Sequence, residues 1–118
     1  MKMRFFELAK RMSHKSDHSH KIGGVLVKKN KVLSVGFNKC KTHTKSNTVF
    51  RSIHCELDCI LGAHEEDIVG ATIYLYRQNK SGIVAISKPC IWCQKLLKDV
   101  GISKVCYTDH NGYKEENV

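Results

Sequence analysis

The hydrophobic and polar positions of the first forty residues predict one helix followed by a hairpin. Apolar residues recur at helical spacing over residues 4–13, with lysine and arginine between them, which indicates a basic amphipathic helix. A β-branched run at 25–27 and a second run at 32–37 predict two strands. The polar segment 28–31 between them contains an asparagine and predicts a tight turn.

The rest of the chain continues to alternate helices with strands. Ser52 is expected to cap a helix that carries apolar residues at helical spacing and ends near Gly62. The segment 71–77 predicts a strand, 91–100 predicts a helix that follows a proline, and 103–107 predicts another strand.

After a turn signal at 109–112, residues 113–118 are expected to return as a short edge strand. Helices that alternate with strands imply an α/β fold of three α-β-α layers, with a mixed sheet of four to five strands and helices on both faces. The strands at 71–77 and 103–107 flank a helix and are expected to be parallel. We expect one domain over residues 1–118, because the length and the 42% hydrophobic content suit a single modest core.

Composition and charge narrow the protein class. No run of 18 apolar residues is present, so no membrane span is expected. The N-terminal segment lacks the apolar core and cleavage site of a signal peptide, which favours a cytoplasmic protein, in the host cytoplasm if the source is viral. The formal net charge of +9, from 20 Lys and Arg against 11 Asp and Glu, favours phosphorylated or polyanionic partners, or else a basic surface with no specific partner.

Four residues at two expected helix starts suggest a metal site. Cys90 and Cys93 are three residues apart, so one helical turn can direct both thiolates to one metal. The positive end of the helix dipole favours the thiolate form that metals bind. His54 is a candidate third ligand, and three protein ligands leave a position for water, as in catalytic zinc sites. The carboxylate of Glu56 could then serve that water without binding the metal.

A structural reading of the same cysteines remains open. Cys55 and Cys59 lie four residues apart on one helix face, so with Cys90 and Cys93 they could form a four-cysteine zinc site. The protein would then be a non-catalytic, zinc-stabilised binding module. Cys59 is more often a small buried hydrophobic residue in such a helix. The isolated Cys40 and Cys106 are expected to be buried in the same way or to be partly exposed thiols.

Several other polar and aromatic residues have competing interpretations. The histidines at 14, 18 and 20 are expected to lie in a solvated loop, since no cysteine accompanies them. Trp92 is expected either to wall a substrate pocket or to enter the core. Asp58 is expected to face solvent or to cap its helix locally.

The two motifs together resemble a known family. The H-x-E of "HCE" at 54–56 followed by the P-C-x-x-C of "PCIWC" at 89–93 is the pattern of zinc nucleobase deaminases. With "GGVLV", "GFNK", "KTHTKS" and "IHCELDCI", the chain resembles the zinc-dependent cytidine and deoxycytidylate deaminases over residues 22–108. It is most similar to the small deoxycytidylate-type enzymes often carried by bacteriophages.

The resemblance implies Zn²⁺ held by His54, Cys90 and Cys93, with Glu56 as the proton carrier. A water activated by the metal would attack the carbon that bears the exocyclic amine, and ammonia would leave. Cys55 stands where the family often has alanine, and its backbone N–H could help to hold the base.

Substrate contacts are expected from Asn38, which matches a family asparagine that contacts sugar or base, and from the basic segment with Lys39, Lys41 and Lys45. This segment favours a phosphorylated substrate, so dCMP is the leading candidate among cytosine nucleotides and nucleosides. A base in single-stranded DNA or RNA is the alternative, which the +9 charge favours. The family likeness also makes a homo-oligomer plausible, whereas nothing in the chain predicts a membrane partner.

Overall fold

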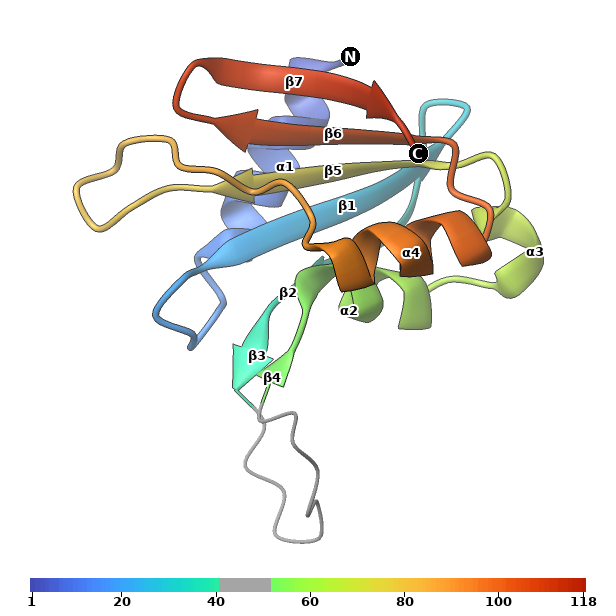
Figure 1. Ribbon diagram of the computed structural model, residues 1–118, viewed down its shortest axis with the longest axis horizontal. Coiled ribbons are helices and arrows are strands. Elements are labelled where there is room, and N and C mark those ends of the chain that lie inside the picture. Colours follow the sequence, from blue (N-terminus) through green and yellow to red (C-terminus); the bar gives the residue numbers. More distant parts are fainter. Residues whose placement is uncertain (41–51) are drawn as a thin grey trace, which may run out of the picture.

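A computed structural model describes residues 1–40 and 52–118 and contains the predicted alternation of helices and strands (Figure 1). The helices are α1 (Met3–Ser13), α2 (Cys55–Leu61), α3 (Glu65–Ile68) and α4 (Ile91–Asp99). The strands are β1 (Ile22–Lys28), β2 (Lys31–Phe37), β3 (Lys39–Cys40), β4 (Ser52–Ile53), β5 (Thr72–Arg77), β6 (Lys104–Asp109) and β7 (Gly112–Asn117).

Five strands form one mixed sheet in the order β2-β1-β5-β6-β7. β5 and β6 are parallel, as the sequence predicts for the two strands that flank α4, and the other neighbours are antiparallel. β7 lies at the edge of the sheet, which confirms the expected return strand. β3 and β4 pair separately as a two-stranded ribbon.

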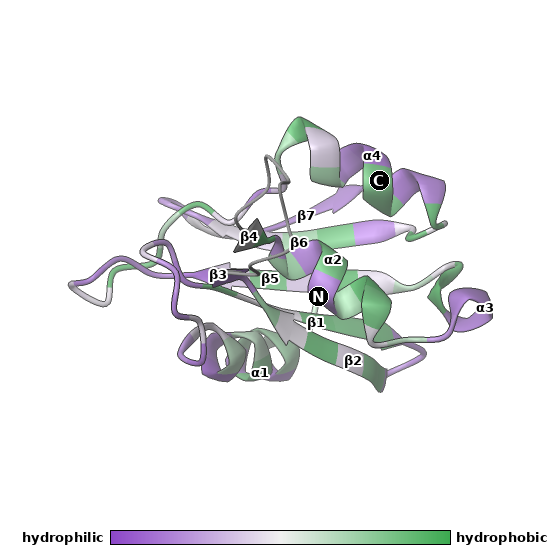
Figure 2. Cartoon of the chain, turned by 90° about the horizontal axis from the view of Figure 1, so that it is seen from below, coloured by the Kyte–Doolittle hydropathy of each residue, from purple (hydrophilic) through white to green (hydrophobic). Residues whose placement is uncertain are grey.

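The sheet lies between two helical layers, with α1 on one face and α2 and α4 on the other (Figure 2). Side chains of β5 alternate between the two faces, because successive residues of a strand point in opposite directions. Tyr74 and Tyr76 belong to the apolar cluster with α1, while Ile73 and Leu75 belong to the cluster with α2 and α4. The three-layer α/β fold is therefore confirmed.

Local backbone chemistry explains the hairpin between β1 and β2. Lys29 and Asn30 have φ of 51° and 62°, the left-handed pair that a two-residue hairpin turn requires. On the face of β1 that packs against α1, a Cβ at Gly23 would collide with the α1 backbone at Ala9 and Ser13. The absence of a side chain at Gly23 thus allows α1 to pack directly on the strand.

The helix boundary predicted at Ser52 is wrong. Ser52 and Ile53 are extended and pair with Cys40 and Lys39, so His54 is the N-cap residue and α2 begins one residue later. A helix capped by Ser52 would need Ile53 to be helical, whereas pairing with β3 holds Ile53 in an extended conformation. The short helix α3 was not predicted, because four residues cannot show helical periodicity. In the two described ranges, every helix is too short or too polar to cross a membrane.

Candidate active site

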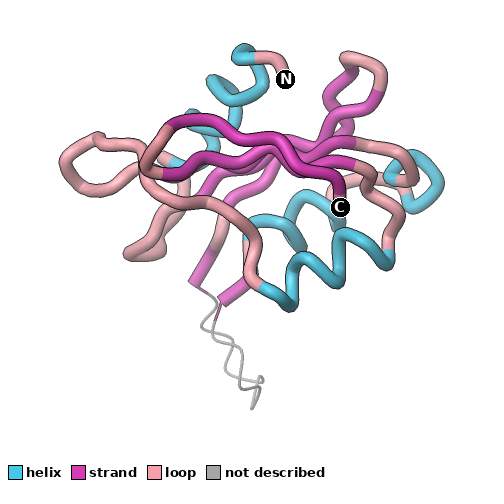
Figure 3. The backbone as a smooth tube through the Cα atoms, turned by 45° about the horizontal axis from the view of Figure 1, so that its top comes forward, coloured by secondary structure: helices cyan, strands magenta, loops and turns pink. Residues whose placement is uncertain are grey.

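The candidate site lies at the carboxyl end of β5, where several segments meet. The loop before β1 and the loop between β5 and α4 leave the sheet at the same end (Figure 3). The N-termini of α2 and α4 lie nearby, so two helix dipoles direct their positive ends toward this region (Figure 1). Open α/β sheets commonly bind ligands outside the carboxyl ends of parallel strands.

Three predicted ligands come together at the two helix starts. The ligand atoms of His54, Cys90 and Cys93 all lie within 4.8 Å of one another. His54 Nδ1 lies 3.3 Å from Cys93 Sγ, although the residues are 39 apart in sequence. His54 precedes α2, Cys90 is the N-cap residue of α4, and Cys93 lies within the first turn of α4.

This donor set fits Zn²⁺. A tetrahedral zinc ion with bonds of about 2.0 Å to nitrogen and 2.3 Å to sulfur places its ligand atoms about 3.5–3.8 Å apart. The separation between His54 and Cys93 is close to this value. Burial, together with the neighbouring Glu56 carboxylate and Cys90, raises the pKa of the Cys93 thiol well above its ordinary value. A bound cation would offset these effects and favour the thiolate.

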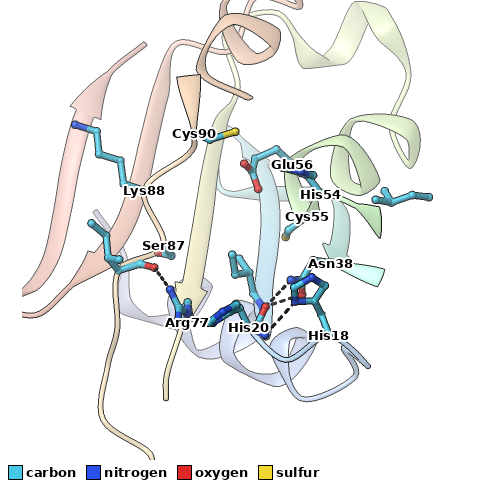
Figure 4. Close-up of a pocket in the computed structure, with 13 residues that line it drawn as sticks. His18, His20, Asn38, His54, Cys55, Glu56, Arg77, Ser87, Lys88 and Cys90 are labelled. Atoms are coloured by element: carbon cyan, nitrogen blue, oxygen red, sulfur yellow. Dashed lines mark hydrogen bonds between the residues drawn. The ribbon is translucent and has the colours of Figure 1, made fainter. Parts of the chain in front are cut away.

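Glu56 is buried beside this donor set. It is 5% exposed and lies in the first turn of α2, where the helix dipole stabilises a carboxylate. Its carboxylate and the Cys90 thiol lie at the same end of the cavity (Figure 4). A buried carboxylate at a site of three metal donors suits proton transfer, because it can serve a bound water without being a ligand.

The four-cysteine alternative is wrong for the described residues. Cys55 and Cys59 are 1% and 0% exposed and belong to the apolar core beneath α2, apart from the ligand cluster. Cys55 Sγ lies 3.6 Å from the backbone carbonyl of Gly36. Cys59 is the small buried residue that its helix position predicts, and Cys106 is also fully buried.

Asn38 lies in the same cavity with most of its amide engaged. Its Oδ1 accepts from the Ser16 hydroxyl at 2.6 Å and from the Ile22 backbone N–H at 2.9 Å, while its Nδ2 donates to the carbonyl of His20. The second hydrogen of Nδ2 has no hydrogen-bond partner among the described residues. Asn38 therefore positions the loop before β1 and can still donate to a ligand.

The cavity has a volume of about 310 Å³, within the range of small-molecule sites. The residues that line it are His18, His20, Ile22, Asn38, Ile53, His54, Cys55, Glu56, Arg77, Ile86, Ser87, Lys88 and Cys90. The histidines at 18 and 20 lie in the loop before β1, as expected, with His20 exposed and His18 half-buried, and both also line the cavity. Arg77, Ser87 and Lys88 were not singled out in the sequence. The only signal for Arg77 was a cation that ends an apolar strand.

Of the other residues that the sequence singled out, those that the structure describes do not line the cavity. The Lys39 ammonium pairs with Asp58 at 3.0 Å, and Asp58 also accepts the Phe37 backbone N–H, so the expectation of a solvent-facing or locally capping Asp58 is wrong. Lys41 and Lys45 lie outside the described residues. Trp92 is 71% exposed, which excludes a core position, and it does not line the cavity.

Comparisons with known proteins show the family to which this chain belongs. The family described as "Cytidine and deoxycytidylate deaminase zinc-binding region" matches residues 1–109. The deoxycytidylate deaminase of Mycobacterium phage D29 is 26% identical, over 87% of this chain and 90% of its own length.

Two solved structures share the fold. The apo dCMP deaminase of cyanophage S-TIM5 has a TM-score of 0.72 at 24% identity, covering 92% of this chain and 86% of that one. Cytidine deaminase from Burkholderia pseudomallei has a TM-score of 0.74 at 18% identity, covering 99% of this chain and 92% of that one. The resemblance to phage-type deaminases is thus confirmed. This chain belongs to the cytidine and deoxycytidylate deaminase family and is a hydrolase of the zinc deaminase type.

Proposed function

We propose that this protein is a zinc-dependent hydrolase that removes the exocyclic amine from the cytosine of a nucleotide, with dCMP as the leading substrate and dUMP and ammonia as products. One observation carries the proposal. The buried Glu56 carboxylate lies in the same cavity as His54 and Cys90, two of the three clustered metal donors. This arrangement supplies a metal position and a proton carrier beside a space that holds one small ligand.

His54, Cys90 and Cys93 would hold the zinc ion. When bound, the ion supplies a water of lowered pKa as the nucleophile. The net reaction adds one water at the carbon that bears the amine and releases ammonia, so the nitrogen must gain protons as its bond to carbon breaks. Glu56 would accept a proton from the attacking water and deliver it to the leaving nitrogen. Its burial keeps bulk water from exchanging that proton.

Two polar groups would orient the base and sugar. The Cys55 backbone N–H lies at the first residue of α2, where helix N–H groups have no intrahelical partner. Asn38 lies on the same side of the cavity as Cys55, and its Nδ2 carries a second hydrogen besides the one donated to the carbonyl of His20 (Figure 4). Phosphate contacts from Lys39, Lys41 and Lys45 stay predictions, and the pairing of Lys39 with Asp58 gives no support to that lysine.

A mononucleotide is better supported as the substrate than a base within single-stranded nucleic acid. Proteins that bind single strands stack successive bases on aromatic side chains. None of the described residues that line the cavity is Phe, Tyr or Trp. The relatives from phage D29 and cyanophage S-TIM5 are named for the mononucleotide, and the net charge of +9 suits a phosphorylated ligand as well as it suits a strand.

The test is ammonia release by the zinc-loaded protein on cytidine, deoxycytidine, CMP, dCMP and a cytosine-containing single-stranded DNA. The proposal predicts that kcat/KM is highest for dCMP. Activity confined to the DNA would replace the proposal with strand editing. Inactivity on all five would refute cytosine deamination by this protein.

A further inference from the structure

The active-site cavity has a second chemical end, formed by Arg77, His18 and His20. Figure 4 shows the Arg77 and His20 side chains next to each other, on the side of the cavity away from Cys90 and Glu56. Arg77 is the last residue of β5 and pairs in register with Ile22 of β1, so sheet pairing brings it to the loop that carries both histidines. Nothing in the proposed reaction uses these three residues.

Arg77 has no counter-ion among the residues that the structure describes. Its Nη2 lies 2.7 Å from His20 Nδ1, and its Nη1 donates to the carbonyl of Ile86 at 3.3 Å. Its Nε is buried and has no hydrogen-bond partner in the described part of the chain. None of the carboxylates in the described ranges forms an ion pair with it. A half-buried guanidinium with unused donors gains more from an anion than an exposed one does, because water stabilises it less.

The hydrogen bonds of the two histidines make both rings donors toward a ligand. Arg77 has only donors, so His20 Nδ1 must accept from it, which places the proton of a neutral His20 ring on Nε2. His18 Nδ1 accepts the backbone N–H of His20 at 3.0 Å, which leaves its proton on Nε2 as well. The three side chains therefore offer N–H donors and no free side-chain acceptor.

The loop that carries the histidines is fixed in place. The Ser16 side chain is 3% exposed, and its oxygen lies 2.6 Å from Asn38 Oδ1 and accepts the backbone N–H of His18 at 3.1 Å. Lys88, the other cation that lines the cavity, differs from Arg77 because its ammonium pairs with Glu116 at 3.5 Å. A fixed set of donors around one unpaired cation is suited to a phosphate group, which has several acceptor oxygens and a negative charge.

We propose that Arg77, His20 and His18 bind the terminal phosphate of a mononucleotide whose base lies at the metal end of the cavity, and that this contact selects nucleotides over nucleosides. The inference rests on the proposed function, since the substrate's base must reach Glu56. A terminal phosphate is favoured over the backbone of a nucleic acid because the cavity, at about 310 Å³, has the size of a site for one small molecule.

Steady-state kinetics tests the selection. The Arg77→Gln variant is compared with Arg11→Gln, which removes the same charge from an exposed position in the last turn of α1. Loss of a charge-assisted contact should lower the ratio of kcat/KM for dCMP to that for deoxycytidine by about 10- to 100-fold in Arg77→Gln, mainly through KM. Arg11→Gln should keep the wild-type ratio. An unchanged ratio in Arg77→Gln would overturn the inference.

A binding measurement separates this inference from the proposed reaction, because it needs no turnover. Each zinc-loaded protein is heated with dUMP, deoxyuridine or a uracil-containing single-stranded DNA, and Tm is followed. Wild type and Arg11→Gln should gain stability from dUMP well beyond that from deoxyuridine, and Arg77→Gln should lose this difference. Equal shifts for dUMP and deoxyuridine in wild type would overturn the phosphate site even if cytosine nucleosides are deaminated. A larger shift with the DNA would overturn the assignment to a mononucleotide.

Discussion

The contact between β1 and the first turn of α2 predicts that adding one methyl group at Gly24 destabilises the fold through the thiol of Cys55. A Cβ at Gly24 would lie 2.7 Å from Cys55 Sγ, 3.0 Å from Cys59 Sγ and 3.2 Å from Leu75 Cδ2. Ordinary contacts between such atoms are about 3.5–4.0 Å. The new methyl group of Gly24→Ala must therefore displace these side chains, of which two belong to cysteines of α2.

The magnitude follows from two opposing effects. Overpacking a core by one methyl group costs about 1–3 kcal/mol. Replacing glycine by alanine restricts the unfolded chain, which returns about 0.4–1 kcal/mol. We expect Gly24→Ala to lower the free energy of unfolding by about 1–2 kcal/mol.

A double-mutant cycle identifies the source of the cost. Cys55→Ala removes the atom nearest to the new methyl group, so Gly24→Ala should cost about 1 kcal/mol less in the Cys55→Ala background. Cys59→Ala is the matched control and should relieve less, because its sulfur lies farther from the new Cβ. Urea unfolding followed by far-UV circular dichroism, at a fixed zinc concentration, measures all five variants. Additivity within about 0.5 kcal/mol for Gly24→Ala and Cys55→Ala would refute the contact argument.

Two further predictions concern the metal and the effect of pH. Removal of metal by a chelator should abolish deamination and lower Tm, and added zinc should restore both in wild type. Added zinc should not raise the Tm of Cys93→Ala, because that variant lacks a buried ligand. An equal zinc-induced shift of Tm in both proteins would contradict the ligand assignment. Burial, with Glu115 nearby, raises the pKa of Cys106 to about 12 from its ordinary 9.0. The folded state then keeps a proton that the unfolded state loses above pH 9, so Cys106 should cost about 1.4 kcal/mol of stability between pH 8 and pH 10. Urea unfolding at both pH values should show a smaller decline in Cys106→Ala, and an equal decline would refute this role.

The sequence predicted the parts of the fold that depend on local patterns. Hydrophobic periodicity located α1, the β1–β2 hairpin, β5, α4 and β6, and the family motifs identified His54, Cys90 and Cys93, whose ligand atoms do cluster. The start of α2 was misplaced because Ser52 is extended by pairing with β3, which is distant in sequence. A capping residue by itself carries no information about such a partner.

The phosphate end of the cavity could not be predicted for the same reason. His20 and Arg77 are 57 residues apart and meet only because β1 pairs with β5. The high local density of lysines after β2 led to the prediction of phosphate contacts in that segment. Arg77 is a single cation at the end of an apolar strand and gives no such signal. Density of charge along the chain does not show which cation lacks a counter-ion, because ion pairs such as that between Lys39 and Asp58 form between distant segments.

The rate of ammonia release from dCMP by zinc-loaded Glu56→Gln, measured beside its bound zinc, tests the central claim most directly. The buried Glu56 is 5% exposed and is assigned to carry protons, whereas His54, Cys90 and Cys93 are assigned to hold the metal. Loss of a general acid–base group predicts a fall in kcat of about 10²–10⁴-fold, with one zinc per chain and the far-UV spectrum unchanged. Activity within about threefold of wild type, or activity lost together with zinc, would contradict the assignment of Glu56 as the proton carrier.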